Sequence, residues 1–147
     1  MENKHKPIQV KIRPVKLGDL PQIVACHNDV SDSNLLRNEW LNAFHDCKNN
    51  SFVAIHLNHV VGFIFVRENM MLLLSVYQKY LGGDIEKSLV ERCLQNRQDL
   101  RFHIRTTNTK GIAHYKSIGF VVEKTIPEYY DAPPCDAFEM VHRIILK

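Results

Sequence analysis

Apolar and polar residues recur along the chain with two different periods, and these periods predict its strands and helices. Alternating or continuous apolar runs predict strands at 8–14, 70–76, 101–106, 121–125 and 137–145. The segment 51–68 has two such runs on either side of a turn, which predicts a hairpin. Apolar residues spaced three and four apart predict helices at 17–28, 31–44, 80–93 and 108–120. The order β-α-α-β-β-β-α-β-α-β-β predicts a mixed sheet with helices on its faces, an α/β fold.

Several local features support these elements. The hairpin is expected to turn at Leu57–Asn58, and the strand 70–76 is apolar on both faces, which favours a central place in the sheet. Asp19 is expected to cap the first helix. The second and third helices have apolar stripes at Leu36, Trp40, Leu41 and Phe44, and at Ile85, Leu89, Val90, Cys93 and Leu94.

Composition narrows the class of protein. The chain has 147 residues, 45% of them apolar and 24% charged, which suits a single globular domain over 1–147. A net charge of +3 is too small to indicate a partner nucleic acid. The four cysteines are far apart in sequence, so we expect reduced thiols and a cytoplasmic protein. We expect neither a signal peptide nor a membrane span.

Two glycines before the third helix raise the question of an anion site. Gly82 and Gly83 precede a helix start, where free backbone N–H groups favour a phosphate. Asp84 and Glu86 follow them, and acidic residues in a first turn also stabilise a helix without any ligand. The segment therefore fits either a phosphate site that carries unfavourable charges or a capped helix.

The segment "NTKGIAHYKSIGF" carries the most specific signal. It places Asn108, Tyr115, Gly119 and Phe120 at fixed spacing between two predicted strands. In this spacing and in the order of its elements, the chain resembles the GNAT superfamily of acetyl-CoA-dependent N-acetyltransferases. The resemblance implies a mostly antiparallel mixed sheet, with the strands around 71–76 and 101–105 parallel and splayed at their C-terminal ends.

The resemblance also implies a co-substrate, acetyl-CoA, and its binding residues. The family has a loop of the form Arg/Gln-x-x-Gly-x-Gly/Ala after the fourth strand, and its backbone binds the CoA pyrophosphate. In this chain Leu81 takes the Arg/Gln position, while Asp84 and Glu86 take the two glycine positions. The implied cofactor-binding residues are Val76, Leu81, Gly82, Gly83, Asp84, Ile85, Glu86, Lys87, Asn108 and Tyr115.

The tail "PEYYDAPPCDAFEM" resembles that of the protein N-terminal (alanine) acetyltransferases. By that resemblance Tyr129 and Tyr130 lie in a loop over the substrate cleft. The alternative is that the two rings only cover an edge of the sheet. The segments 31–40 and 126–134, both loop-like, are the expected determinants of specificity.

Amine acetylation requires an acid and a base. The phenol of a tyrosine, with an ordinary pKa of about 10, is a proton donor at neutral pH, and Tyr115 is the expected acid for the CoA thiolate. His103 lies at the position where some N-terminal acetyltransferases have a basic Glu or His. The alternative is that Arg101, His103 and Arg105 form the solvated side of a strand. His56 and His59 flank a predicted turn, and we expect no metal site.

Three functions remain open from the sequence. The first is an acetyl-CoA-dependent acyltransferase that acts on a primary amine, at a protein N-terminus or lysine, with a homodimer possible. The second is a GNAT-fold binding or regulatory module without catalysis, which the two carboxylates in the pyrophosphate loop favour. The third is an acetyltransferase for a small-molecule amine.

Overall fold

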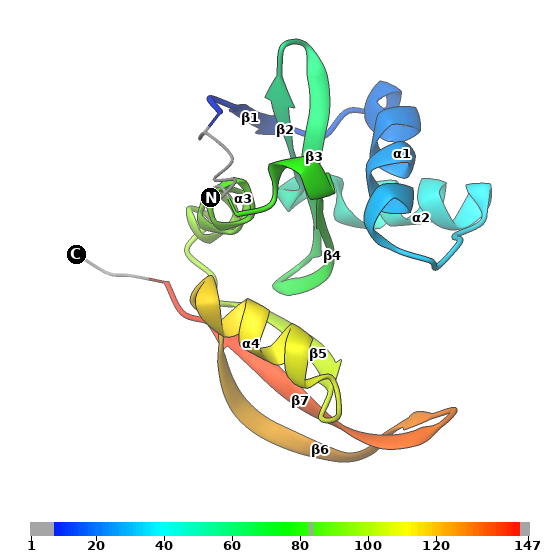
Figure 1. Cartoon of the computed structure of the whole chain (residues 1–147), viewed down its shortest axis with the longest axis vertical. Coiled ribbons are helices and arrows are strands. Elements are labelled where there is room, and N and C mark those ends of the chain that lie inside the picture. Colours follow the sequence, from blue (N-terminus) through cyan, green and yellow to red (C-terminus); the bar gives the residue numbers. More distant parts are fainter. Residues whose placement is uncertain (1–7, 83, 145–147) are drawn as a thin grey trace, which may run out of the picture.

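A computed structural model describes residues 8–82 and 84–144, which form a seven-stranded sheet and four α-helices (Figure 1). The strands are β1 (Lys11–Pro14), β2 (Phe52–His56), β3 (His59–Arg67), β4 (Met70–Val76), β5 (Leu100–Arg105), β6 (Val121–Asp131) and β7 (Pro134–His142). The helices are α1 (Leu20–Val30), α2 (Arg37–Cys47), α3 (Ile85–Leu94) and α4 (Thr109–Ser117), with single 3₁₀ turns at Leu17–Asp19, Lys48–Asn50 and Gln78–Tyr80. The predicted order of strands and helices is confirmed.

The strand order across the sheet is β1-β2-β3-β4-β5-β7-β6. Neighbouring strands are antiparallel except β4 and β5, which are parallel and joined by the crossover helix α3. Among the described residues, Met70 and Arg101 are the aligned pair between these two strands, and the strands separate beyond it. The predicted parallel pair, splayed toward its C-terminal end, is therefore confirmed.

Helices cover both faces of the sheet, as predicted, and each face has its own core. On one face α1 and α2 pack against β2 and β3, where the buried Trp40 ring meets Phe63 and Phe65 edge-on. On the other face α3 and α4 contribute Leu89, Val90 and Ile112 to a second core. Figure 1 shows β1–β4 with α1, α2 and α3 in one half of the molecule, and β5–β7 with α4 in the other. Of the described helices, none combines the length and apolar character needed to cross a bilayer.

Elements set by local sequence form where the pattern predicts them. Leu57 and Asn58 both have positive φ, the backbone that a two-residue hairpin turn requires, so this predicted turn is confirmed. The predicted stripe of α3 is buried at Ile85, Leu89, Val90 and Cys93 and half-buried at Leu94. Local pattern was therefore sufficient for these segments.

Two expectations about helix ends are wrong. The Asp19 carboxylate does not cap α1; it accepts two hydrogen bonds from the Arg13 guanidinium at 2.8 Å and one from the Lys16 backbone N–H. Leu36 does not belong to the buried stripe of α2, because the helix begins at Arg37 and the Leu36 side chain is 65% exposed. The Arg13 contact determines the role of Asp19, and the lack of packing leaves Leu36 exposed; the spacing of residues in the sequence predicts neither outcome.

The length of β6 also differs from the expectation. The strand was predicted over 121–125 but extends from Val121 to Asp131, so Tyr129 and Tyr130 belong to a strand rather than to a loop. Pairing with β7 resumes at Tyr130, opposite Cys135, after an irregularity that absorbs the intervening residues. The Glu128 N–H, at a residue with positive φ, donates to the Asp136 carboxylate within this irregularity. Cross-strand bonds thus extend a segment whose polar, proline-containing sequence is typical of a loop.

We predict that Gly119→Ala destabilises the protein by about 2 kcal/mol in its free energy of unfolding. Gly119 has φ +111 after the end of α4, a backbone that favours glycine at a helix C-terminus, and an added Cβ would overlap the His142 ring. Gly18→Ala is the matched control, because an added Cβ there meets nothing within 4 Å. Urea unfolding measures both; equal midpoints for the two variants would contradict the prediction.

Candidate active site

The separation of β4 and β5 creates a gap at the middle of the sheet. Arg101 is the β5 residue aligned with β4, so the following residues of β5 border the gap. Phe102 and Ile104 belong to the core beneath α3 and α4. Because side chains alternate along a strand, His103 projects to the opposite face. The gap therefore has different chemical groups on its two sides.

Tyr115 lies on the α4 side. Its ring packs against Phe102, at 4.5 Å between ring centroids, and against Phe120 at 6.0 Å. Burial raises the pKa of Tyr115, and the nearby Glu86 carboxylate raises it further. The phenol therefore stays protonated at neutral pH and remains a hydrogen-bond donor.

His103 lies on the other face, in a row with Arg101 and Arg105, as the alternation predicted. Its Nε2 lies 3.1 Å from Oε1 of Glu139, and its ring centroid lies 4.8 Å from that of Tyr129. The His103 side chain is 19% exposed, so solvent reaches it. The structure thus brings the predicted base and one of the predicted substrate tyrosines together.

The tyrosine pair is held by contacts with β5. Tyr129 and Tyr130 meet edge-on with their centroids 4.9 Å apart, and the Arg105 guanidinium lies 4.3 Å from the centroid of Tyr130. Arg105 also donates to the carbonyls of Ala132 and Pro133. The β6–β7 hairpin is therefore fixed to the strand that bears His103.

Glu139 was missed by the sequence reasoning. It is buried on β7, and its carboxylate contacts the side chains of Arg101 at 3.3 Å, His103 at 3.1 Å and Lys124 at 3.7 Å. The available signal was a single carboxylate within the apolar strand segment "AFEMV". Buried carboxylates are uncommon unless they are paired, so a carboxylate in an apolar strand indicates charged partners on neighbouring strands.

The start of α3 differs in part from the expectation. Gly82 has a positive φ, Leu81 is 37% exposed, and Val76 is buried at the end of β4. Asp84 is the N-cap residue but its side chain makes no capping hydrogen bond, so the alternative of a helix capped by this side chain is not what the structure shows. Among the residues that the structure describes, the first helical bond of α3 runs from the Ser88 N–H to the Asp84 carbonyl. Gly83 lies outside the described residues.

Ile85, Glu86 and Lys87 form the first turn of α3 and take different environments. Ile85 is buried in the core, whereas Glu86 accepts a hydrogen bond from Nε2 of His114 on α4 at 2.9 Å. The Glu86 side chain is only 13% exposed. This contact spans the space between the two helices, so one of the two acidic residues at the loop is engaged by an opposing side chain.

Asn108 holds the start of α4. Its Oδ1 accepts a hydrogen bond from the Gly111 N–H at 3.0 Å, the arrangement of an N-cap. An added Cβ at Gly111 would lie 2.7 Å from the Asn108 side chain, so this packing requires glycine. The residue predicted to contact the cofactor therefore positions the helix that bears Tyr115.

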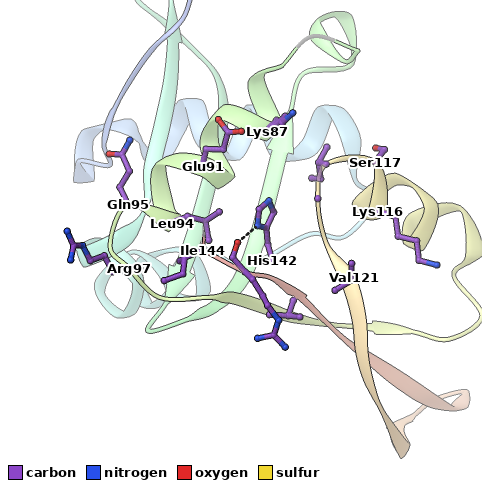
Figure 2. Close-up of a pocket in the computed structure, with 14 residues that line it drawn as sticks. Lys87, Glu91, Leu94, Gln95, Arg97, Lys116, Ser117, Val121, His142 and Ile144 are labelled. Carbon is purple, nitrogen blue, oxygen red and sulfur yellow. Dashed lines mark hydrogen bonds between the residues drawn. The ribbon is translucent and has the colours of Figure 1, made fainter. Parts of the chain in front are cut away.

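A groove lies between α3 and the C-terminal end of α4, with the end of β7 as its floor (Figure 2). Its volume is about 1050 Å³. Its cationic side chains are Lys87, Arg97, Lys116 and Arg143, and Glu91 is the carboxylate that lines it. Of these residues the sequence reasoning selected only Lys87. Arg143 is already paired with Asp99 and Glu123, so the positive charge that suits an anionic ligand comes mainly from the two lysines and Arg97.

Comparison with known proteins places the fold. No protein-family model matches the chain, and no curated protein matches its sequence. Among solved structures, Ard1 from Thermoplasma volcanium is similar with a TM-score of 0.75 and 22% identity, over 94% of this chain and 99% of that one. The ribosomal-protein-S18-alanine N-acetyltransferase from Escherichia coli is similar with a TM-score of 0.74 and 17% identity, over 95% and 96% of the two chains.

A third similar structure contains a ligand. Arabidopsis thaliana Naa50, in complex with the bisubstrate analogue CoA-Ac-MVNAL, has a TM-score of 0.71 and 22% identity, over 91% of this chain and 98% of that one. These likenesses show the fold, and the chain has the fold of N-terminal acetyltransferases. The resemblance inferred from the Asn108–Phe120 segment is confirmed at that level.

We predict that Cys135 reacts with iodoacetamide at pH 8 before the other three cysteines do. Cys135 is partly exposed, and hydrogen bonds with Thr106 and then Thr107 lower the pKa of its thiol. Burial raises the pKa of the other three thiols, to about 12 for Cys26 and Cys93 and to about 11 for Cys47.

Mass spectrometry should find a single early modification, which is absent in Cys135→Ser, and four modifications after denaturation. Early modification of a buried cysteine in the folded protein would contradict the prediction.

Proposed function

We propose that this protein transfers an acetyl group from acetyl-CoA to a primary amine, at a protein N-terminus or a lysine. The observation that carries the proposal is the gap between β4 and β5, with Tyr115 on one face of β5 and His103 on the other. An acid and a base on opposite faces of a strand whose edge lacks a ladder partner suit a transfer between two substrates that enter from opposite sides.

Each group has a defined role in this reaction. Acetyl-CoA supplies an activated thioester. His103 accepts a proton from the attacking amine, directly or through water, as the new C–N bond forms. Tyr115 donates its phenolic proton to the sulfur as the C–S bond breaks. The raised pKa of Tyr115 keeps that proton available at neutral pH.

The residues of this chain fit the co-substrate in part. Acetyl-CoA carries several phosphate charges, and Lys87, Lys116 and Arg97 in the groove would attract them. The amides of the first turn of α3 are a second place for phosphate. Asp84 and Glu86 oppose binding there, although Glu86 is already paired with His114. The groove therefore supports binding, and the loop weakens it.

A peptide amine is the substrate that we favour. The similar Naa50 structure contains a bisubstrate analogue, and a similar NatC complex is bound to a Gag peptide and CoA. In this chain Tyr129 lies beside His103, on the face where the amine would enter, and Tyr130 packs against Tyr129. The two rings thus offer an apolar surface next to the base.

A specific observation favours a second candidate function, a binding or regulatory module without catalysis. The two family glycine positions carry carboxylates, and one of them bridges α3 to α4. A measurement of acetyl-CoA binding separates the two functions. If the protein does not bind acetyl-CoA at millimolar concentration, the non-catalytic module becomes the leading proposal.

We predict that Tyr115→Phe lowers kcat by about 10²- to 10⁴-fold, because the sulfur loses its proton donor. The affinity for acetyl-CoA should change little, since the aromatic ring and its packing against Phe102 remain. Steady-state kinetics with a peptide library and acetyl-CoA measure kcat, and calorimetry measures affinity. Tyr80→Phe, on the turn before α3, is the matched control; wild-type turnover in Tyr115→Phe would remove the acid role.

We predict that Asp84→Gly plus Glu86→Gly tightens acetyl-CoA binding by about 10- to 100-fold. Each carboxylate near a phosphate costs about 1 kcal/mol after screening by solvent and salt. Calorimetry at two salt concentrations measures this, and added salt should weaken binding more in the glycine variant than in the wild type.

The matched control for this double change is Asp32→Gly plus Glu68→Gly, which removes two exposed carboxylates on other segments. If the glycine variant of the loop folds but binds no better than that control, the carboxylates do not oppose the ligand.

A further inference from the structure

The buried carboxylate of Glu139 is the nearest charged partner of the proposed base. Glu139 and His103 are directly opposite one another in the β5–β7 register. The Glu139 side chain is 11% exposed, and its Oε1 lies 3.1 Å from His103 Nε2. Because both residues are fixed by strand pairing, this contact is part of the sheet and not an encounter between flexible chains.

The two oxygens of this carboxylate have different partners. Oε2 faces Arg101 Nη1 at 3.3 Å and Lys124 Nζ at 3.7 Å, whereas Oε1 faces the imidazole. Two cations are therefore the partners of Oε2. Oε1 is left to accept the imidazole N–H.

A chain of charged contacts fixes the orientation of the carboxylate. Arg101 also pairs with Glu123, which in turn pairs with Arg143 at the end of β7. The groups around the His103 ring are then Arg101 and Arg105 on its own strand, Glu139 on β7, and Lys124 and Tyr129 on β6. Among them Glu139 is the anion in contact with the ring.

From this geometry we infer that Glu139 is a positioning residue for His103. A neutral imidazole has one donor and one acceptor nitrogen. When Nε2–H donates to Glu139, Nδ1 has the lone pair and is the atom that takes the proton of the amine. Among the described residues Nδ1 has no hydrogen-bond partner. The inference rests on the proposed function, in which His103 is the base.

The first test does not depend on activity. In ¹⁵N-labelled protein without acetyl-CoA, the wild type should show an imidazole proton on Nε2 of His103, protected from exchange by the carboxylate. His103→Gln assigns the signal. In Glu139→Ala the signal should disappear, and in Asp99→Asn, a carboxylate paired with Arg143 and remote from His103, it should remain. A protected proton on Nδ1 in the wild type would overturn the inference even if the enzyme is active.

The second test uses turnover. We expect Glu139→Ala to lower kcat by about 10- to 100-fold with the KM for acetyl-CoA unchanged, and Glu139→Gln to restore part of it, because an amide oxygen also accepts Nε2–H. In the His103→Ala background, Glu139→Ala should have little further effect. Equal losses in both backgrounds would show that Glu139 acts only on the fold.

The outcomes separate the two proposals. If the wild type shows the Nε2 proton but has no acetyltransferase activity, the proposed function fails while the positioning of His103 stands. If Glu139→Ala does not fold, the isosteric Glu139→Gln carries the test: in the His103→Ala background it should cause no further loss of turnover, because the ring that it positions is gone. An equal loss from Glu139→Gln with and without His103 would overturn the inference.

Discussion

The candidate site depends on one constraint, the separation of β4 and β5 after their aligned pair Met70–Arg101. A continuous ladder would pair the edge of β5 along its length, and hydrogen-bonded backbone would separate the faces that carry Tyr115 and His103. Unpaired strand edges are costly unless something covers them or a ligand bonds to them. The crossover helix α3 keeps the two strands parallel, and the hairpin partner β7 holds β5 in place on its other side.

The charges at the start of α3 decide how well this end of the helix accepts an anion. The amides of a first turn and the cationic groove both favour phosphate. Asp84 and Glu86 have the opposite effect at the same helix end, and the Glu86–His114 contact joins the two helices that border the groove. Binding therefore reflects a balance of opposed terms of about 1 kcal/mol each, which is why an active enzyme and a non-catalytic module remain the two functions to be separated.

On the face of the sheet that carries His103, the main charged group is the buried carboxylate of Glu139. Burying Glu139 costs free energy that three donors must offset, and replacing such a group by an apolar residue is often neutral for stability. Stability alone therefore gives little reason for a carboxylate at this position. Its contact with the histidine that borders the gap supplies a chemical reason, the selection of one ring nitrogen as the acceptor.

The sequence by itself determined the elements and much of their burial, because these depend on neighbours a few residues apart. The Leu57–Asn58 turn, the α3 stripe and the stop at Gly119 follow from local backbone and periodicity. Contacts between strands and helices needed the tertiary structure: His103 and Glu139 are 36 residues apart, and Glu86 and His114 are 28 apart. The length of β6 depended likewise on its pairing with β7. Register and packing choose such partners, and a shift of one residue would turn His103 or Glu139 to the opposite face.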